Sequence, residues 1–318
     1  MTDELKERFC RDVGIRISIF DDEVFEERVA LLEKTEEWNE FNKLISERFN
    51  NDETAYFNYY NTLKDTVINH IKESATFKVL DSGMLGQYTV NPAYEHICKS
   101  DTWKPSCVGH KYISIDMKKA NFTSLVAYGN LIGIPFFNSL DYEEFMSQFT
   151  DIEHVKKSKY IRQVVFGNCT PKRQITFEKY LMSLVLDYML SSSLITKHDI
   201  YSFMHDEIIL KADGIDDDKL HSIYNYVKEN TETLTFQYFS VSCINIEGSL
   251  AYIKNIMLGK NEGNKEIKCV DPINSPIAYR VIKNEDIKES DLYFTINGRR
   301  AKFVEKPHVE ILDNMEDS

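Results

Sequence analysis

The sequence predicts an α+β protein in which helices cover a small antiparallel sheet. The first 80 residues place apolar side chains at helical spacing, which indicates a helix-rich N-terminal region. Two short apolar runs, at residues 112–116 and 201–210, carry carboxylates where a strand would leave a buried sheet. Beyond residue 259, short strand signals and a turn predict a small β-rich C-terminal appendage.

Length, charge and cysteine content limit the class of protein. At 318 residues and 42% hydrophobic composition, the chain can bury a substantial core. Its net charge of -13 disfavours indiscriminate binding to phosphate backbones or anionic membranes, so any nucleic-acid contact is expected to be local. The six cysteines form no Cys-x-x-Cys pair, and no apolar run is long enough to span a bilayer. We therefore expect a soluble intracellular protein, and its Ile-, Asn-, Lys- and Tyr-rich composition is typical of a virus, a phage or a low-GC bacterium.

The N-terminal region begins with one strand signal and continues with helices. Residues 15–20 alternate as a short strand does, and Asp21 then caps a first helix. Thr35 opens a second helix, and a third is expected over residues 54–72. The aromatic side chains of these helices recur at helical spacing, which indicates packing in a core rather than stacking on a ligand.

The central segment starts with a long connection. Residues 81–110 are rich in Gly, Pro, Ser and Asn, and long ordered loops of this kind often line functional clefts. After the run at 112–116, helices are predicted at residues 121–129, 141–148, 151–166 and 171–190. The last of these begins with Thr170 as cap and Pro171 as first residue, a favoured helix start.

The rest of the chain supplies the remaining strands. After the hairpin at 201–210 we expect a helix at 216–231, a strand at 239–246 and a short helix that ends near residue 254. This order of elements fits a small sheet covered on one face by helices. The expected C-terminal elements are strands at 278–282, 292–296 and 301–304, a turn at Asn297-Gly298 and an acidic tail at 313–318.

Three carboxylates are candidates for a divalent-metal site. Asp206 and Glu207 lie at the predicted tip of the 201–210 hairpin, and Asp116 ends the run at 112–116. Two Mg²⁺ or Mn²⁺ ions held by carboxylates can activate a hydroxyl and stabilise the leaving oxygen of a phosphoryl transfer. A surface position would explain any one of these acids, but the apolar residues around them place all three where a buried sheet emerges.

A basic helix between the acidic segments is a candidate phosphate-binding element. Lys156, Lys159 and Arg162 recur at spacings of three on the predicted helix 151–166, and Phe166 follows on the same side. A solvated charged face would give the same pattern. Further positive charge nearby, against the net charge of -13, favours a phosphate ligand; it comes from Lys118, Lys119, Lys172 and Arg173.

These three segments, in this order, resemble the palm motifs of the family A polymerases, the group that includes bacterial repair DNA polymerases and single-subunit phage and mitochondrial RNA polymerases. Residues 114–121, Ser-Ile-Asp-Met-Lys-Lys-Ala-Asn, are similar to the first motif. By this resemblance Asp116 binds both metal ions and Asn121 meets the sugar of the nucleotide. Residues 162–167, Arg-Gln-Val-Val-Phe-Gly, resemble the fingers-helix motif, which makes Arg162 the phosphate clamp.

The last motif completes the resemblance, which also implies a division of the chain into regions. Residues 204–207, Met-His-Asp-Glu, resemble a Val-His-Asp-Glu motif, so that Asp206 is the second metal ligand, Glu207 assists catalysis and His205 lies near the primer end. Lys159 and Phe166, beside Arg162, are expected to bind the nucleotide as well. The implied regions are a thumb-like part at 1–80, a palm with short fingers at 81–258 and the appendage at 259–318.

The chain also departs from the family pattern. Thr170 and Pro171 stand where the family continues to Tyr-Gly, unless Phe166-Gly167 is itself that pair. Only 43 residues separate Arg162 from His205, so the fingers are expected to be short and the template grip to be reduced or completed by an accessory protein. No exonuclease domain is expected. Asn121 replaces the Glu of the DNA-synthesising members and can hydrogen-bond a 2'-hydroxyl, which leaves the choice of sugar open.

The predicted function is a nucleotidyltransferase that extends a 3'-hydroxyl with nucleoside triphosphates by a two-metal mechanism. Template-directed DNA synthesis on a primer is favoured by Glu207, because the related RNA polymerases usually depart from the motif there. An RNA polymerase, a primase-like enzyme or a template-independent polymerase is the alternative, because of Asn121. Two other classes are a catalytically inactive palm-fold subunit that binds nucleic acid or protein, and a metal-dependent nuclease. The first would not need all three acids, and the second would not need the basic helix.

Overall fold

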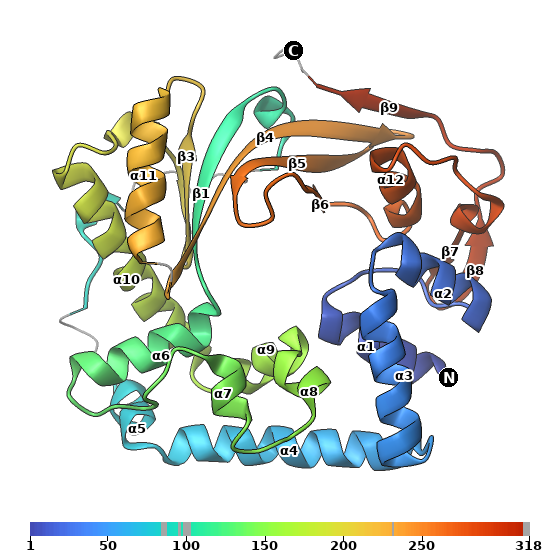
Figure 1. The fold of residues 1–318 in the computed structure, drawn as a ribbon, viewed down its shortest axis with the longest axis horizontal. Helices are drawn as coiled ribbons and strands as arrows, with labels where there is room; N and C mark the ends of the chain where they lie inside the picture. The colour runs from blue at the N-terminus through green and yellow to red at the C-terminus, as the bar shows by residue number, and fades with distance from the viewer. Residues whose placement is uncertain (84–87, 95–96, 98–102, 231, 314–318) are drawn as a thin grey trace.

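The computed structural model describes residues 1–83, 88–94, 97, 103–230 and 232–313. It confirms the predicted α+β class, with a helical N-terminal region, an antiparallel sheet and small C-terminal β hairpins. In Figure 1 the sheet arches over the helices, and the C-terminal segment returns to the N-terminal helices, so that the elements form a ring. In the described part of the chain, no helix is long and apolar enough to cross a membrane.

The N-terminal helices begin where the sequence places capping residues. The side chains of Thr2, Asp21, Asp52 and Ser74 each accept a hydrogen bond from a backbone N–H of the first helical turn. The apolar faces of these helices pack into one aromatic-rich core. The helices are α1 (Asp3–Val13), α2 (Asp22–Leu31), α3 (Thr35–Phe49), α4 (Glu53–Glu73) and α5 (Ala75–Asp81).

The expected strand at residues 15–20 is not a strand, and side chains rather than a neighbouring strand donate hydrogen bonds to its Ser18 and Phe20 carbonyl groups. The Ser18 carbonyl accepts a hydrogen bond from the guanidinium of Arg28 at 3.1 Å. The Ser18 hydroxyl accepts another from the backbone N–H of Thr295 at 3.1 Å. The alternating apolar residues therefore belong to an irregular segment held between α2 and the C-terminal part of the chain.

The central helices follow the first strand, and the predicted helix at 151–166 is divided in two. Ser158 interrupts it, since its hydroxyl accepts a hydrogen bond from the backbone N–H of Ile161 and so caps a new helix. The elements are η1 (Pro92–Tyr94), η2 (Pro105–Cys107), β1 (Lys111–Met117), α6 (Ala120–Leu131), α7 (Tyr142–Met146), α8 (Glu153–Lys157), α9 (Lys159–Gly167) and α10 (Pro171–Ser191).

A buried carboxylate joins α1 to this break. Asp12 accepts a hydrogen bond from the Ser158 hydroxyl at 2.7 Å, and its other oxygen lies 3.2 Å from Nε2 of His154. The Asp12 side chain is 1% exposed, so neither contact is weakened by water. Asp12 therefore fixes the position of α9 relative to the N-terminal helices.

Replacing Asp12 with Ala is expected to lower the free energy of unfolding by about 3 kcal/mol, because it leaves buried polar partners unsatisfied. Thermal or urea unfolding measures this change. The matched control is Glu7→Ala on the exposed face of the same helix, which should change stability little. Equal stability of the Asp12→Ala and Glu7→Ala proteins would contradict the role of Asp12.

The main sheet is antiparallel throughout. Its order is β2-β3-β1-β4-β5-β6, and β9 pairs with the far end of β4. The short helix expected near residue 254 is instead part of β5, because Glu247 and Gly248 both adopt positive φ and turn the chain into a β4–β5 hairpin. The bounds are η3 (Lys197–Asp199), β2 (Ile200–Phe203), β3 (Glu207–Lys211), α11 (Asp217–Glu229), β4 (Leu234–Ile246), β5 (Ser249–Gly259) and β6 (Lys265–Lys268).

The two faces of the sheet differ around β1. One face is covered by α10 and α11, which pack on Ile113, Ile115 and the inward side chains of β3 and β4 (Figure 1). The opposite face carries Ser114 and Asp116. The polar residues of β1 therefore lie on the face that α10 and α11 leave open.

The C-terminal segment is only partly the expected β appendage. The strand predicted at 278–282 is a helix, α12 (Ser275–Ile282), which carries Pro276 in its first turn and packs its apolar side on β4 and β5. The predicted turn at Asn297-Gly298 is confirmed, and it joins β7 (Tyr293–Ile296) to β8 (Arg299–Lys302). The remaining elements are η4 (Glu289–Leu292) and β9 (Val309–Leu312).

Candidate active site

The fold brings the three predicted acids to one place. Asp116, near the end of β1, lies directly opposite Glu207, the first residue of β3. Asp206 lies in the turn before β3, and its backbone carbonyl accepts a hydrogen bond from the N–H of Met117 at 2.8 Å. Acids that are distant in the sequence thus meet at the end of the central strand.

The surroundings of Asp116 resist its ionisation. Burial is the largest cause, and the nearby carboxylates of Glu207 and Asp206 add to it, so that the pKa of Asp116 rises to about 7. Glu207 is held beside it by the Ser114 hydroxyl, which donates a hydrogen bond to Oε1 at 2.6 Å. Such crowding of acids creates a site where a bound cation would be stabilised.

The acids fit the chemistry of Mg²⁺, which takes oxygen ligands and usually binds one or two carboxylates plus water and substrate phosphates. Asp116 and Glu207 supply such a facing pair. Among the described residues, no group of three or more His, Cys, Asp or Glu side chains is close enough to hold a metal by itself. Water and a phosphate-bearing substrate would therefore have to complete the coordination.

A pocket of about 750 Å³ opens beside Asp116. Its lining holds six basic side chains and a single carboxylate, a marked contrast with the net charge of the chain. Gly259 closes one side with φ +99°, and a Cβ there would meet the Phe236 carbonyl oxygen at 2.2 Å. The basic residues are Lys118, Lys119, Lys159, Arg162, Lys228 and Lys260.

Arg162 is the best-placed anion-binding group of this pocket. Its guanidinium is partly buried, 5.6 Å from the centre of the Tyr142 ring, and burial lowers its pKa. Among the described residues no carboxylate forms an ion pair with Arg162, whereas Lys119 in the same pocket pairs with Glu143. A partly buried guanidinium that lacks a carboxylate partner has strong capacity for a phosphate ligand.

Other predicted binding residues are placed elsewhere. Phe166 is 0% exposed and packs against Phe122 and Tyr142 in the core of the helical N-terminal part, so its side chain does not line the basic pocket. Lys156 belongs to α8, where it pairs with Glu153. Because the helix breaks at Ser158, Lys156 does not share a helix face with Lys159 and Arg162. The predicted basic stripe is thus shortened to its last two members.

The remaining candidates do not line the pocket. His205 is exposed in the turn before Asp206. Asn121 is in the first turn of α6, partly exposed, and its carbonyl accepts a hydrogen bond from the Ser124 hydroxyl. Arg173, from the next helix, pairs with Asp81 at 2.9 Å.

Sequence reasoning missed a buried lysine on the open face of the sheet. Lys254 of β5 is 4% exposed, and its Nζ donates a hydrogen bond to Oε1 of Gln237 at 2.6 Å. Burial lowers its pKa to about 8, while the charges of Glu207 and Asp116 act in the opposite direction. A lysine inside the apolar run of β5 was the available signal.

Glu178 of α10 is a fourth carboxylate that the sequence did not single out. It is 3% exposed, and among the described residues its Oε1 has no hydrogen-bond partner. Burial, with a further contribution from Asp206, raises its pKa to about 7. In the sequence, Glu178 is one of several polar residues of the helix at 171–190, and nothing in the local pattern marks it as buried.

The raised pKa of Glu178 predicts a pH dependence of stability. The folded protein keeps the proton from the ordinary pKa of 4.5 up to about 7, whereas the unfolded chain releases it, so the free energy of unfolding falls as pH rises through this window. Glu178→Gln should remove up to about 3 kcal/mol of that fall. Denaturant unfolding between pH 4.5 and 8 measures it. Glu229→Gln, at an exposed position, is the control, and Asp116 accounts for residual dependence of the same sign.

Comparisons of this chain with protein-family models, with curated protein sequences and with solved structures give no match. The function is therefore inferred from the geometry. The features available are an antiparallel sheet, a facing pair of carboxylates at the end of its central strand, and an adjoining basic pocket.

Proposed function

We propose that this protein is a nucleotidyltransferase that extends a 3'-hydroxyl with nucleoside triphosphates, in the manner of a compact polymerase palm. The observation that carries the proposal is that Asp116 and Arg162 line one pocket. A carboxylate next to unpaired positive charge suits a substrate that brings both phosphates and a divalent cation.

In the proposed reaction the 3'-hydroxyl loses its proton to water and its oxygen attacks the α-phosphorus. The bond between the α-phosphorus and the oxygen that bridges to the β-phosphate breaks, and pyrophosphate leaves. Arg162 and Lys159 would hold the triphosphate and neutralise charge on the leaving pyrophosphate. Asp116, Asp206 and Glu207 would supply carboxylate ligands for Mg²⁺ or Mn²⁺. Two such ions, when bound, activate the hydroxyl and stabilise the leaving oxygen. The protein's own contribution is then to position the substrates and to stabilise charge.

The proposed polymer is DNA made on a primer–template, with ribonucleotide use as the alternative. Glu207 favours DNA synthesis by resemblance, whereas Asn121 leaves room for a ribose. Asn121 lies two residues after Lys119, which lines the pocket, and its side chain is partly exposed. The two alternatives differ in which nucleotide set supports extension.

A primer-extension assay tests the proposal. The protein is incubated with Mg²⁺ or Mn²⁺, a labelled primer with and without template, and deoxyribo- or ribonucleotides. We expect extension that is lost in Asp116→Ala and in Asp206→Ala. Shortening of the primer would indicate a nuclease instead. Absence of any change, with triphosphate binding retained, would contradict an enzyme and favour a binding subunit.

A further inference from the structure

Two bodies of the protein face each other across the basic pocket. Lys159 and Arg162 come from α9, which belongs to the helical body formed by α1 to α9. Thr235, Phe236 and Gly259 come from the sheet. The width of the pocket therefore depends on how the helical body sits relative to the sheet.

The two bodies are joined at two places. On one side the chain passes directly from β1 into α6 and from α9 into α10, and α6 packs against α10. On the other side, residues near the two ends of the chain meet, where α2 contacts α12 and the segment around η4 (Figure 1). This second junction, between residues 27–33 and residues 280–293, closes the ring, and we call it the clasp.

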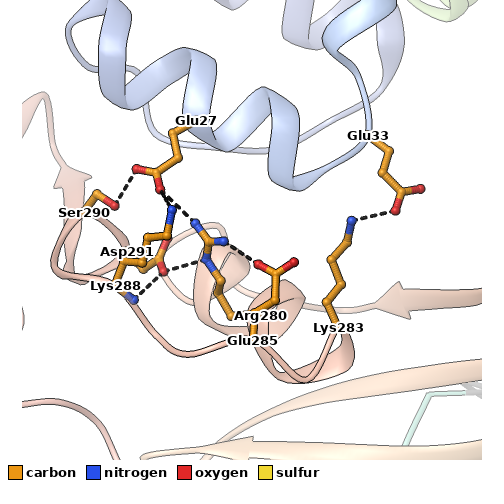
Figure 2. A network of polar contacts seen from close by, with 8 residues as sticks. All are labelled: Glu27, Glu33, Arg280, Lys283, Glu285, Lys288, Ser290 and Asp291. Atoms are coloured by element: carbon orange, nitrogen blue, oxygen red, sulfur yellow. Dashed lines mark hydrogen bonds and ion pairs between the residues drawn. The ribbon is translucent and has the colours of Figure 1, made fainter.

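Ion pairs dominate the clasp. Glu27 of α2 accepts hydrogen bonds from Arg280 at 3.0 Å, from Lys288, and from the Ser290 hydroxyl at 2.7 Å (Figure 2). Arg280 is held in turn by Asp291 at 3.0 Å. A second pair, Glu33 with Lys283 at 2.6 Å, lies at the other end of the same contact.

Arg28 adds a set of backbone contacts to the clasp. Its guanidinium donates hydrogen bonds to the carbonyl oxygens of Ser290 at 3.0 Å and Tyr293 at 2.6 Å, as well as to Ser18. The Arg28 side chain is buried, which strengthens these bonds. Neighbouring residues of α2 thus hold the C-terminal segment by hydrogen bonds and charge.

The apolar sides of the two helices point away from this contact. Phe25 and Val29 of α2 pack into the core of the helical body, whereas Ile277 and Ala278 of α12 pack on the sheet. Tyr279 of α12 also touches the core of the helical body. Hydrogen bonds and ion pairs make up most of the clasp, whereas apolar and aromatic side chains pack the junction between α6 and α10.

We infer that the clasp opens to admit a nucleic acid strand to the basic pocket and closes behind it. This inference rests on the proposed function for the identity of the ligand. The clasp can separate while Phe25 and Val29 stay packed in the helical body and Ile277 and Ala278 stay packed on the sheet. Only Tyr279 would leave the core that it touches, and the packed side keeps the bodies together. Opening would widen the pocket between α9 and the sheet.

Spin labels on both sides of the clasp test its opening directly. Asn39→Cys and Asp286→Cys lie at exposed positions, in a protein whose Cys98 and Cys269 are replaced by Ser. We expect one distance in the wild-type clasp and an added longer distance in Arg280→Ala. Lys283→Glu, which places two acids side by side, should have the same effect, and its combination with Glu33→Lys should restore the single distance. Unchanged distances in both single variants would overturn the inference.

The association rate of a fluorescent primer–template supplies the functional test. Arg280→Ala and Lys283→Glu should bind it severalfold faster than the wild type, while affinity for nucleotide alone stays unchanged. An unchanged or slower rate in both variants would show that the clasp does not control entry. If the wild type binds neither nucleotide nor primer–template, the proposed function fails, whereas the label distances still decide whether the clasp opens.

Discussion

Replacing Asp116 with Asn is expected to abolish primer extension and to make the folded protein more stable. Asn cannot supply the carboxylate that faces Glu207, so we expect a rate loss of roughly 10³-fold or more. Above pH 7 the substitution also removes a charge that burial and neighbouring acids destabilise. The free energy of unfolding should therefore rise by about 2 kcal/mol.

Extension rates and urea unfolding at pH 8 measure the two effects in the same preparation. Asp218→Asn, on the exposed side of α11, is the matched control and should change neither quantity. The diagnostic feature is that the extension rate falls while the free energy of unfolding rises. Replacing an Asp that only supports the fold would lower both quantities together. Retained extension in Asp116→Asn would remove this residue from the catalytic machinery.

Replacing Arg162 with Ala should weaken the binding of nucleoside triphosphates roughly 10- to 100-fold, as expected when charge-assisted hydrogen bonds are lost. Arg162→Lys should recover part of the affinity, because a lysine keeps the charge but not the planar fork of donors. Calorimetric titration with a triphosphate and Mg²⁺ measures the dissociation constant. Stability should change little, because Arg162 has no carboxylate partner among the described residues.

Arg173→Ala is the matched control for Arg162. This arginine begins the neighbouring helix α10, but it pairs with Asp81 and does not line the basic pocket. Its replacement should leave nucleotide affinity within error of the wild type. A similar loss in both variants would mean that the positive charge of the region acts generally and that Arg162 has no specific contact.

The acids were predictable from the sequence because each one lies at one end of a short apolar run, and strands of one sheet emerge at a shared edge. The pairing of Asp116 with Glu207 follows from strand order, which the sequence did not specify. Sequence patterns gave the wrong helix bounds where a contact between distant residues determines the local structure. Ser158 ends one helix and caps the next through its bond to Asp12, and a helical reading of residues 151–166 could not include that contact.

Buried polar groups were the least predictable part of the site. Glu178 and Lys254 look like ordinary surface residues in the sequence, and only packing shows that both are almost completely buried. The sequence of residues 278–282 carries a strand signal, yet this segment belongs to helix α12, which has Pro276 in its first turn and packs on β4 and β5. Burial depends on distant partners, which a local pattern does not contain.

Closing the ring through both ends of the chain has a consequence for folding. Arg28 donates a hydrogen bond to the carbonyl oxygen of Tyr293, although 265 residues separate them. Contacts of such long range form late, because the entropy of closing a long loop must be overcome first. During synthesis the N-terminal helices can assemble as they leave the ribosome, but Arg28 can form its hydrogen bond with Tyr293 only after almost the whole chain has been made. An incomplete nascent chain would thus carry the acids of the site before it carries the closed ring.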